Sequence, residues 1–319
     1  MEIFGKRFRN IYPHSSHTLL RVLLWKLGLV KKDPPARHAG QMSEQKWPIH
    51  TCSENLSVAL VEQRIRATWI GHSTFLIQHH GINILTDPIF GDCGPFPLGA
   101  LRRLNAPGIS LDRLPKIHHV LISHSHYDHL DAPTIRALGN GVHYWVPEGL
   151  RAWFRKRGIA SCEEIAWWQS ASLSEKVVIH GVPAQHGSGR TPWGRDRTHW
   201  CGWVIESAER RAYFAGDTGY SPSFREIGQR FGGFDLSMIP IGAYNPGWLM
   251  QPMHLNPADA IRAHLDVKSR LSIACHWGTF RLTDEPLSEP SRLLFEELCL
   301  QGIDPDKFRA LQPGESVEA

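Results

Sequence analysis

The chain has 319 residues, of which 42% are hydrophobic and 21% charged, with a formal net charge of +4; this composition is that of a globular protein and excludes a disordered one. It contains no run of about 18 apolar residues, which excludes a transmembrane helix, and its first residues lack the ordered regions of a signal peptide. The six cysteines form no CxxC pair, which excludes a zinc ribbon or thioredoxin-like site and leads us to expect a reducing, cytoplasmic compartment.

The basic charge is concentrated at the N-terminus. Residues 1–32 contain seven basic residues and one acidic residue, a net charge of +6. Because the whole chain carries +4, the remainder carries −2. A slightly acidic remainder without a basic stripe leads us to expect no nucleic-acid partner.

Residues 17–32 are predicted to form a basic amphipathic helix that ends before Pro34. Its apolar face carries Leu19, Leu20, Leu23, Leu24, Leu27 and Val30. This face suits two roles, peripheral contact with the inner face of an anionic membrane or packing on the rest of the protein. The polar stretch 35–63 is predicted to be a wrapping arm, so that residues 1–63 form an N-terminal extension and residues 64–319 one domain.

Strand-like and helix-like patterns alternate in the rest of the chain. Strands are predicted near 65–70, 74–78, 82–86, 118–123, 142–146, 177–182, 200–206, 211–215, 236–241 and 271–275. Helices are predicted near 133–138, 148–157, 223–230, 257–265 and 288–300. Early hairpins followed by strand–helix alternation favour an α/β (α+β) fold, with two sheets packed face to face and helices outside them.

The most informative segment is the hexapeptide His124-Ser125-His126-Tyr127-Asp128-His129, which follows a β-like run. It places four metal-ligating side chains, three imidazoles and one carboxylate, in six positions. Four such groups are costly to bury unless a cation coordinates them. The alternative is a histidine-rich surface loop. Asp131 and Gly139 have the residue types that begin and end a helix after this segment.

Three later β-like runs also end in a possible ligand: His186, Asp217 and His276. Taken singly, each histidine has an alternative interpretation as an ordinary surface or core residue, and the aspartate as a turn residue. Their order after the hexapeptide, each closing an apolar strand, favours a shared metal site.

These residues together resemble the metallo-β-lactamase superfamily. Longer motifs resemble its branch that contains N-acylphosphatidylethanolamine-hydrolysing phospholipase D: Gly71-His72-Ser73-Thr74, Leu85-Thr86-Asp87-Pro88-Ile89-Phe90, Phe214-Ala215-Gly216-Asp217-Thr218-Gly219-Tyr220, Ile239-Pro240-Ile241-Gly242-Ala243-Tyr244 and His276-Trp277-Gly278-Thr279-Phe280. The resemblance extends from about residue 64 to about residue 312. It implies a four-layer αββα sandwich of two mixed sheets, with metals at one edge between the sheets.

The resemblance also implies two divalent metal ions. One would be held by His124, His126 and His186, the other by Asp128, His129 and His276, with Asp217 bridging both. Zinc is expected, and the same ligands also accept Mn²⁺ and Fe²⁺.

Four further residues have expected roles at this centre. The resemblance implies that His254 contacts the substrate, and the alternative is a surface histidine. Asp128, Asp217 and His254 are the residues expected to be catalytic. His72, Asp87 and Tyr244 are expected to orient ligands or contact substrate. For Asp87, simple turn chemistry before Pro88 is the alternative.

Two metal ions that share a bridging hydroxide can hydrolyse a phosphodiester without a protein nucleophile. The first hypothesis is therefore a phospholipase D-type phosphodiesterase that acts on glycerophospholipids, and the second is a lactonase or another carbonyl hydrolase. A third is a non-catalytic, membrane-associated metal-binding protein. The loops over 91–110 and 187–200 are predicted to form walls of the substrate pocket.

Overall fold

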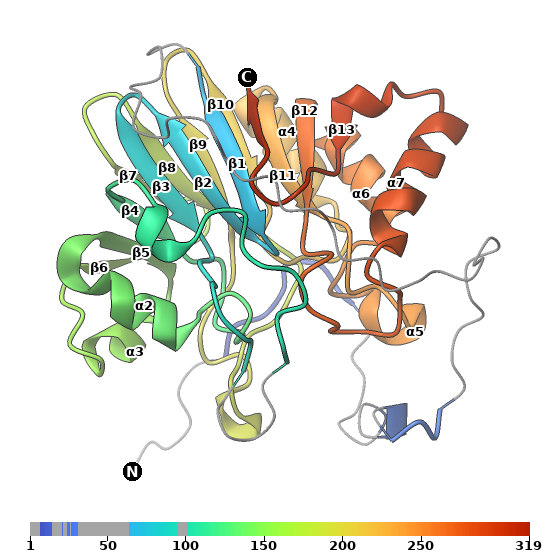
Figure 1. Ribbon diagram of the computed structural model, residues 1–319, viewed down its shortest axis with the longest axis horizontal. Helices are drawn as coiled ribbons and strands as arrows, with labels where there is room; N and C mark the ends of the chain where they lie inside the picture. The colour runs from blue at the N-terminus through green and yellow to red at the C-terminus, as the bar shows by residue number, and fades with distance from the viewer. Residues whose placement is uncertain (1–6, 15–20, 22–23, 26, 31–63, 95–100) are drawn as a thin grey trace.

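Two seven-stranded β-sheets form the centre of the protein, as seen in a computed structural model that describes residues 7–14, 21, 24–25, 27–30, 64–94 and 101–319 (Figure 1). The first sheet has the strand order β14-β1-β2-β3-β4-β5-β6 and the second β13-β12-β11-β10-β9-β8-β7. The first contains β1 (Arg66–Gly71), β2 (Thr74–His79), β3 (Ile82–Thr86), β4 (His119–Leu121), β5 (His143–Pro147), β6 (Cys162–Ile165) and β14 (Ser316–Glu318). The second contains β7 (Ser170–Ser172), β8 (Val178–Val182), β9 (Gly202–Glu206), β10 (Arg211–Phe214), β11 (Phe234–Pro240), β12 (Ser269–Cys275) and β13 (Phe308–Arg309).

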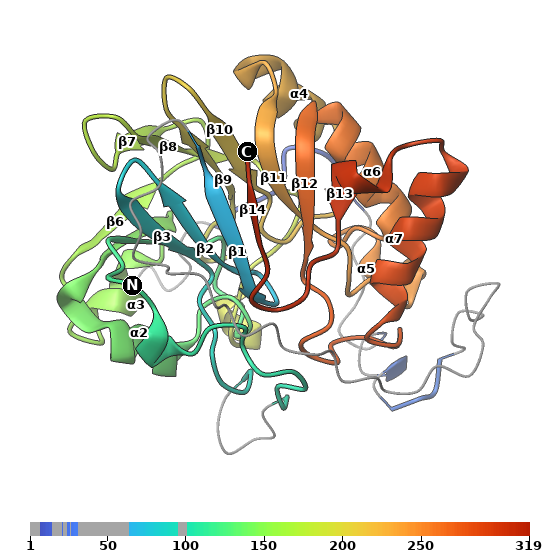
Figure 2. The same ribbon diagram turned by 45° about the horizontal axis from the view of Figure 1, so that its top comes forward.

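Helices cover the outer faces of both sheets. The first sheet is covered by α2 (Ala132–Leu138) and α3 (Arg151–Arg155), and the second by α4 (Ser223–Phe231), α6 (Pro257–Asp266) and α7 (Glu289–Leu300) (Figures 1 and 2). The short helix α5 (Gly247–Met250) precedes α6, and single 3₁₀ turns span Leu111–Arg113, Gly139–Gly141, Pro192–Gly194 and Pro305–Lys307. The order helix, sheet, sheet, helix confirms the predicted αββα sandwich.

Side chains of the first sheet alternate between two apolar clusters. Trp69 of β1 packs in a cluster shared with the second sheet, whereas its neighbour Ile70 packs in a cluster that includes residues of α2 and α3. Leu121 and Val120 of β4 divide in the same way. Successive residues of a strand point to opposite faces, so a sheet buried on both faces needs a continuous apolar run rather than an alternating one.

All ten predicted strands and all five predicted helices are present, with bounds shifted by a few residues. The strands β6, β7, β13 and β14 and the helix α5 were not predicted. These elements have two to four residues each, and β6 contains Glu163 and Glu164. Neighbouring strands supply their pairing, so their own composition carries little signal.

Most of the predicted helix over 17–32, and the arm over 35–63, lie outside the described residues. Of the described part, Trp25 Nε1 donates to Asp284 Oδ2 at 2.9 Å, and the Arg21 guanidinium carbon lies 4.8 Å from the ring centroid of Trp248. Leu27 is 61% exposed. Within the described part of the chain, no helix has the length and apolarity to cross a bilayer. Membrane contact by residues 17–32 stays a prediction.

Two helices begin at the predicted caps. Asp131 Oδ2 accepts a hydrogen bond from Thr134 N at 3.0 Å before α2, and Gly139 follows the last residue of this helix as its C-cap. Asn256 Oδ1 accepts from Asp259 N at 2.9 Å before α6, and Pro257 follows as the first helical residue. The second cap fixes the start of α6, three residues after His254.

We expect Asn256→Ala to lower the free energy of unfolding by about 1 kcal/mol, because the backbone N–H of Asp259 loses its side-chain acceptor. Asn256→Ser keeps an acceptor at this position and should lose less. Chemical denaturation of both variants measures the difference, and equal losses would show that the side-chain acceptor does not stabilise the helix.

Candidate metal centre

The seven predicted ligands lie at the carboxyl ends of four strands. The hexapeptide follows β4 of the first sheet, and His186, Asp217 and His276 follow β8, β10 and β12 of the second. The candidate site therefore lies where the two sheets meet. Trp203 Nε1 of β9 donates to Ile122 O at 3.0 Å and links the sheets close to this point.

Gly216 allows β10 to end beside the hexapeptide. Its φ is +61°, and a Cβ atom there would lie 2.7 Å from the Cβ of Ser123. Any other residue would combine a disfavoured backbone conformation with a steric clash. The glycine thus lets Asp217 approach the first sheet.

The first predicted ligand group comes together as three facing imidazoles. His124 Nε2 lies 2.8 Å from His126 Nδ1, and His186 Nε2 lies 3.2 Å from the same nitrogen. All three ring nitrogens lie within 4.8 Å of one another. Neutral imidazoles in this arrangement suit a divalent cation.

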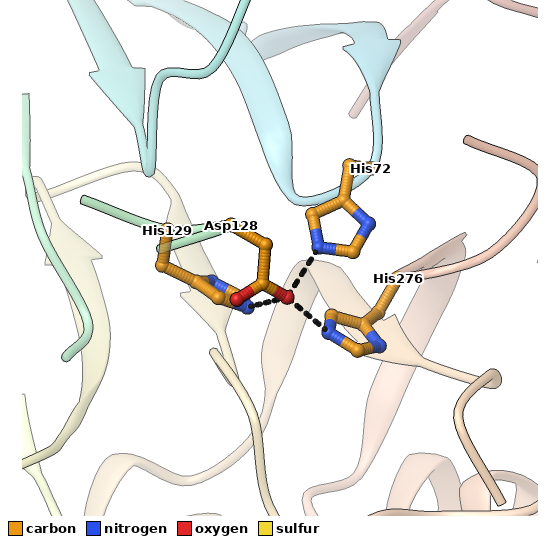
Figure 3. A group of neighbouring side chains, drawn as sticks. All are labelled: His72, Asp128, His129 and His276. Atoms are coloured by element: carbon orange, nitrogen blue, oxygen red, sulfur yellow. Dashed lines mark hydrogen bonds and ion pairs between the residues drawn. The ribbon is translucent and has the colours of Figure 1, made fainter. Parts of the chain in front are cut away.

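The second predicted group also comes together, with one addition (Figure 3). Asp128 Oδ2 lies 3.4 Å from His129 Nε2 and 3.3 Å from His276 Nε2. His72, from the turn between β1 and β2, places its Nε2 3.0 Å from the same oxygen. His72 therefore lies among the predicted ligands and could itself hold a metal ion, whereas the sequence predicted that it would orient a ligand or contact substrate.

A single carboxylate oxygen lies between the two groups. Asp217 Oδ2 is 3.1 Å from His276 Nε2 and 3.2 Å from His129 Nε2. The same oxygen is 3.7 Å from His186 Nε2 and 3.9 Å from His124 Nε2. These distances give Asp217 the position that a bridging ligand requires.

The residues present fit a metal centre. Asp217 Oδ1 is buried and has no hydrogen-bond partner within the described residues. An unsatisfied buried polar atom costs about 1–3 kcal/mol, and a coordinated cation would remove that cost. Imidazole nitrogens and carboxylate oxygens without thiolates suit Zn²⁺, Mn²⁺ or Fe²⁺.

Asp87 is hydrogen-bonded to the predicted ligand His129. Its Oδ2 accepts from His129 Nδ1 at 2.6 Å and from Ser123 Oγ at 2.5 Å, and its Oδ1 accepts from Ser123 N at 2.6 Å. The bond to Nδ1 leaves Nε2 of His129 facing the cluster. Asp87 also has a φ of +35°, so its turn geometry and its bond to the ligand occur together.

Burial and charge act differently on the two sides of the site. Burial, together with neighbouring imidazoles, lowers the pKa of His124 well below its usual range. Burial opposes the charged form of His276 as well, but Asp217 and Asp128 raise its pKa to about 9. Burial opposes ionisation of Asp217 too, yet His129 and His276 hold its pKa well below the usual range.

His254 lies beside the cluster. Its Nδ1 is 3.9 Å from Asp217 Oδ2, and its side chain is 13% exposed. Burial lowers the pKa of His254 to about 4, so the ring is neutral at pH 7. Tyr244 donates its hydroxyl to Glu289 Oε1 of α7 at 2.7 Å, and its predicted role at the site stays a prediction.

A pocket of about 780 Å³ opens onto His126 and His186. The predicted loop 187–200 contributes residues 187–191, Arg195, Asp196 and Trp200 to its walls. Residues 8–14 line the same pocket, which was not predicted, because the sequence carries no signal that this N-terminal segment returns to the site. Of the other loop, residues 95–100 lie outside the described part.

The comparisons with known proteins agree with this geometry. The family model for the Beta-lactamase superfamily domain matches residues 82–277. The chain belongs to the metallo-β-lactamase superfamily. As a member of this superfamily it is a metal-dependent hydrolase.

The relatives of this chain include proteins from the branch that contains N-acylphosphatidylethanolamine-hydrolysing phospholipase D. N-acyl-phosphatidylethanolamine-hydrolyzing phospholipase D 1 of Caenorhabditis elegans is 35% identical over 273 residues, which are 81% of this chain and 77% of the relative. An uncharacterized protein of Mycobacterium tuberculosis is 41% identical over 300 residues, 90% of this chain and 77% of its own length. A solved metallo hydrolase from Ignicoccus hospitalis shares the fold, with a TM-score of 0.61 at 22% identity, covering 80% of this chain and 98% of that one. The predicted resemblance is confirmed.

We expect Asp87→Asn to lower the affinity for divalent metal about 10- to 100-fold. All three groups bonded to this carboxylate are donors in the present geometry, so an amide NH₂ would face at least one of them. Competition with a chromophoric chelator measures the affinity. Asp235→Asn, on β11 away from the site, is the matched control, and equal affinities in both variants would contradict the role of Asp87.

Proposed function

We propose that the chain is a phosphodiesterase of the phospholipase D type that hydrolyses glycerophospholipids such as N-acylphosphatidylethanolamine. The observation that carries the proposal is the position of Asp217 Oδ2 between two groups of three ligands. This arrangement suits a two-metal site rather than a single ion. The relative in Caenorhabditis elegans, whose name states this activity, supports the substrate class.

Two divalent ions held by these residues would lower the pKa of a shared water and stabilise negative charge on phosphoryl oxygens. We assign His124, His126 and His186 to one ion and Asp128, His129 and His276 to the other, with Asp217 shared and zinc as the expected metal. Asp87 and Met253 hold the rings of His129 and His186 through their Nδ1 atoms, at 2.6 and 2.9 Å. The ligand geometry is thus set before a substrate enters.

We infer that the neutral ring of His254 contacts a substrate oxygen, because it lies beside the shared carboxylate and is partly exposed. The pocket next to it combines charge with apolar surface. Arg9 and Arg195 line it together with Ile11, Leu249 and Met253. Cationic and apolar walls in one pocket favour an anionic amphiphile, which supports a phospholipid over a small uncharged lactone.

Asp217→Asn should abolish hydrolysis, because the amide keeps the shape of the side chain and removes the negative charge shared by both ligand groups. Initial rates with a phosphodiester substrate, together with the metal content of the purified protein, measure the effect. Asp306→Asn, an exposed carboxylate far along the chain, is the control. Full activity in Asp217→Asn would refute the shared-ligand assignment.

A substrate panel tests the reaction class. We expect turnover of N-acylphosphatidylethanolamine and of bis(p-nitrophenyl) phosphate, with release of phosphatidic acid from the lipid. The panel also includes lactones and nitrocefin as carbonyl substrates. Hydrolysis of a lactone without hydrolysis of either phosphodiester would replace the proposal by a carbonyl hydrolase.

A further inference from the structure

Residues 7–14, here called the N-terminal segment, lie against the loop that carries His186. Phe8 N donates to Asp196 O at 2.8 Å, and the Phe8 ring stacks on His199 with 4.4 Å between the ring centroids. At the other end of the segment, the Tyr12 hydroxyl donates to the Glu226 carboxylate of α4. The segment is therefore fastened on both sides of Asn10.

The side-chain amide of Asn10 pairs with the backbone of His186. Asn10 Nδ2 donates to His186 O at 2.8 Å, and Asn10 Oδ1 accepts from His186 N at 3.1 Å. The amide thus satisfies both backbone groups of this residue, as a neighbouring strand would. His186 follows β8 by four residues and has no strand partner there within the described sheets.

A third contact fixes the orientation of this amide. Trp200 Nε1 donates to Asn10 Oδ1 at 3.0 Å, so the oxygen accepts two hydrogen bonds while the nitrogen donates to a carbonyl. Rotating the amide by half a turn would place its NH₂ against two donors and its oxygen against a carbonyl oxygen. Only the observed orientation satisfies all three partners.

The ring of His186 is held from the opposite side. Its Nδ1 lies 2.9 Å from Met253 O, which leaves Nε2 facing His126 and Asp217. The ring is therefore oriented by Met253 and the backbone by Asn10. A shift of the backbone would move Nε2 away from the other two imidazoles, and coordination tolerates deviations of only about 0.2 Å.

We propose that Asn10 is a positioning residue for the ligand His186, and that the N-terminal segment completes the metal centre. The inference rests on the proposed ligand role of His186. The same segment lines the pocket that opens onto this ligand, so metal binding and the shape of the pocket depend on one set of contacts. The competing explanation is that Asn10 only fastens the segment to the domain.

The test uses the full chain loaded with Co²⁺, whose absorption bands report ligand geometry. In Asn10→Ala the backbone of His186 loses its partner, and we expect the Co²⁺ bands to change and the affinity to fall about 10- to 100-fold in chelator competition. Asn10→Leu keeps the bulk of the side chain without its hydrogen bonds and should lose affinity to a similar degree. Tyr12→Phe is the matched control, because it removes the side-chain hydrogen bond that joins the segment to α4 and leaves the contacts of His186 in place. It should bind and absorb as the unchanged chain does.

The outcomes separate this inference from the proposed function. Unchanged Co²⁺ bands and affinity in either Asn10 variant would overturn the inference, whatever the substrate. Equal losses in Tyr12→Phe would overturn it too, because they would show that fastening the segment is enough. If the Asn10 variants lose metal while the unchanged chain hydrolyses no phosphodiester, the inference stands and the proposed reaction fails.

Discussion

The structure depends on one buried carboxylate oxygen of Asp217, which lies among five imidazoles that follow strands of both sheets. Burying acidic and imidazole groups together is unfavourable unless they neutralise one another or bind a cation. The fold meets this constraint by placing these groups just beyond the ends of strands, where they leave the apolar layers intact. The core therefore stays apolar, and the polar groups gather at one edge.

The scaffold around this edge serves mainly to hold side chains at fixed distances. Gly216 permits the close approach of β10 to the hexapeptide, and the indole of Trp203 donates a hydrogen bond across the sheets. The Asp87 carboxylate accepts hydrogen bonds from the backbone N–H and the hydroxyl of Ser123, and it also accepts one from His129 Nδ1. Gly216, Trp203 and Asp87 are not among the seven candidate ligands. Because they connect both sheets to the site, the positions of the candidate ligands depend on the whole sandwich and not on a single loop.

The N-terminal segment extends this principle beyond the sandwich. Its residue Asn10 pairs with the backbone of the candidate ligand His186, 176 positions later, and its neighbours line the pocket beside that residue. A boundary drawn at residue 63 describes where the sheets begin, but the contacts of the site cross it. In the proposed hydrolase, residues 7–14 would contact both the substrate and the backbone of His186. Substrate binding would then be coupled to the position of this candidate ligand.

The sequence by itself determined the αββα class, ten of the strands and the seven candidate ligands. Strand periodicity, helix caps and the spacing of His124 to His129 are local patterns, and they can be read without coordinates. Only the tertiary structure decided that His72 lies among the ligands, that Asp87 bonds His129, and that Asn10 holds His186. The short edge strands also belong to this second group, because their pairing comes from neighbours. Such contacts join residues far apart in the chain, and no local pattern encodes which distant side chain will meet which backbone group.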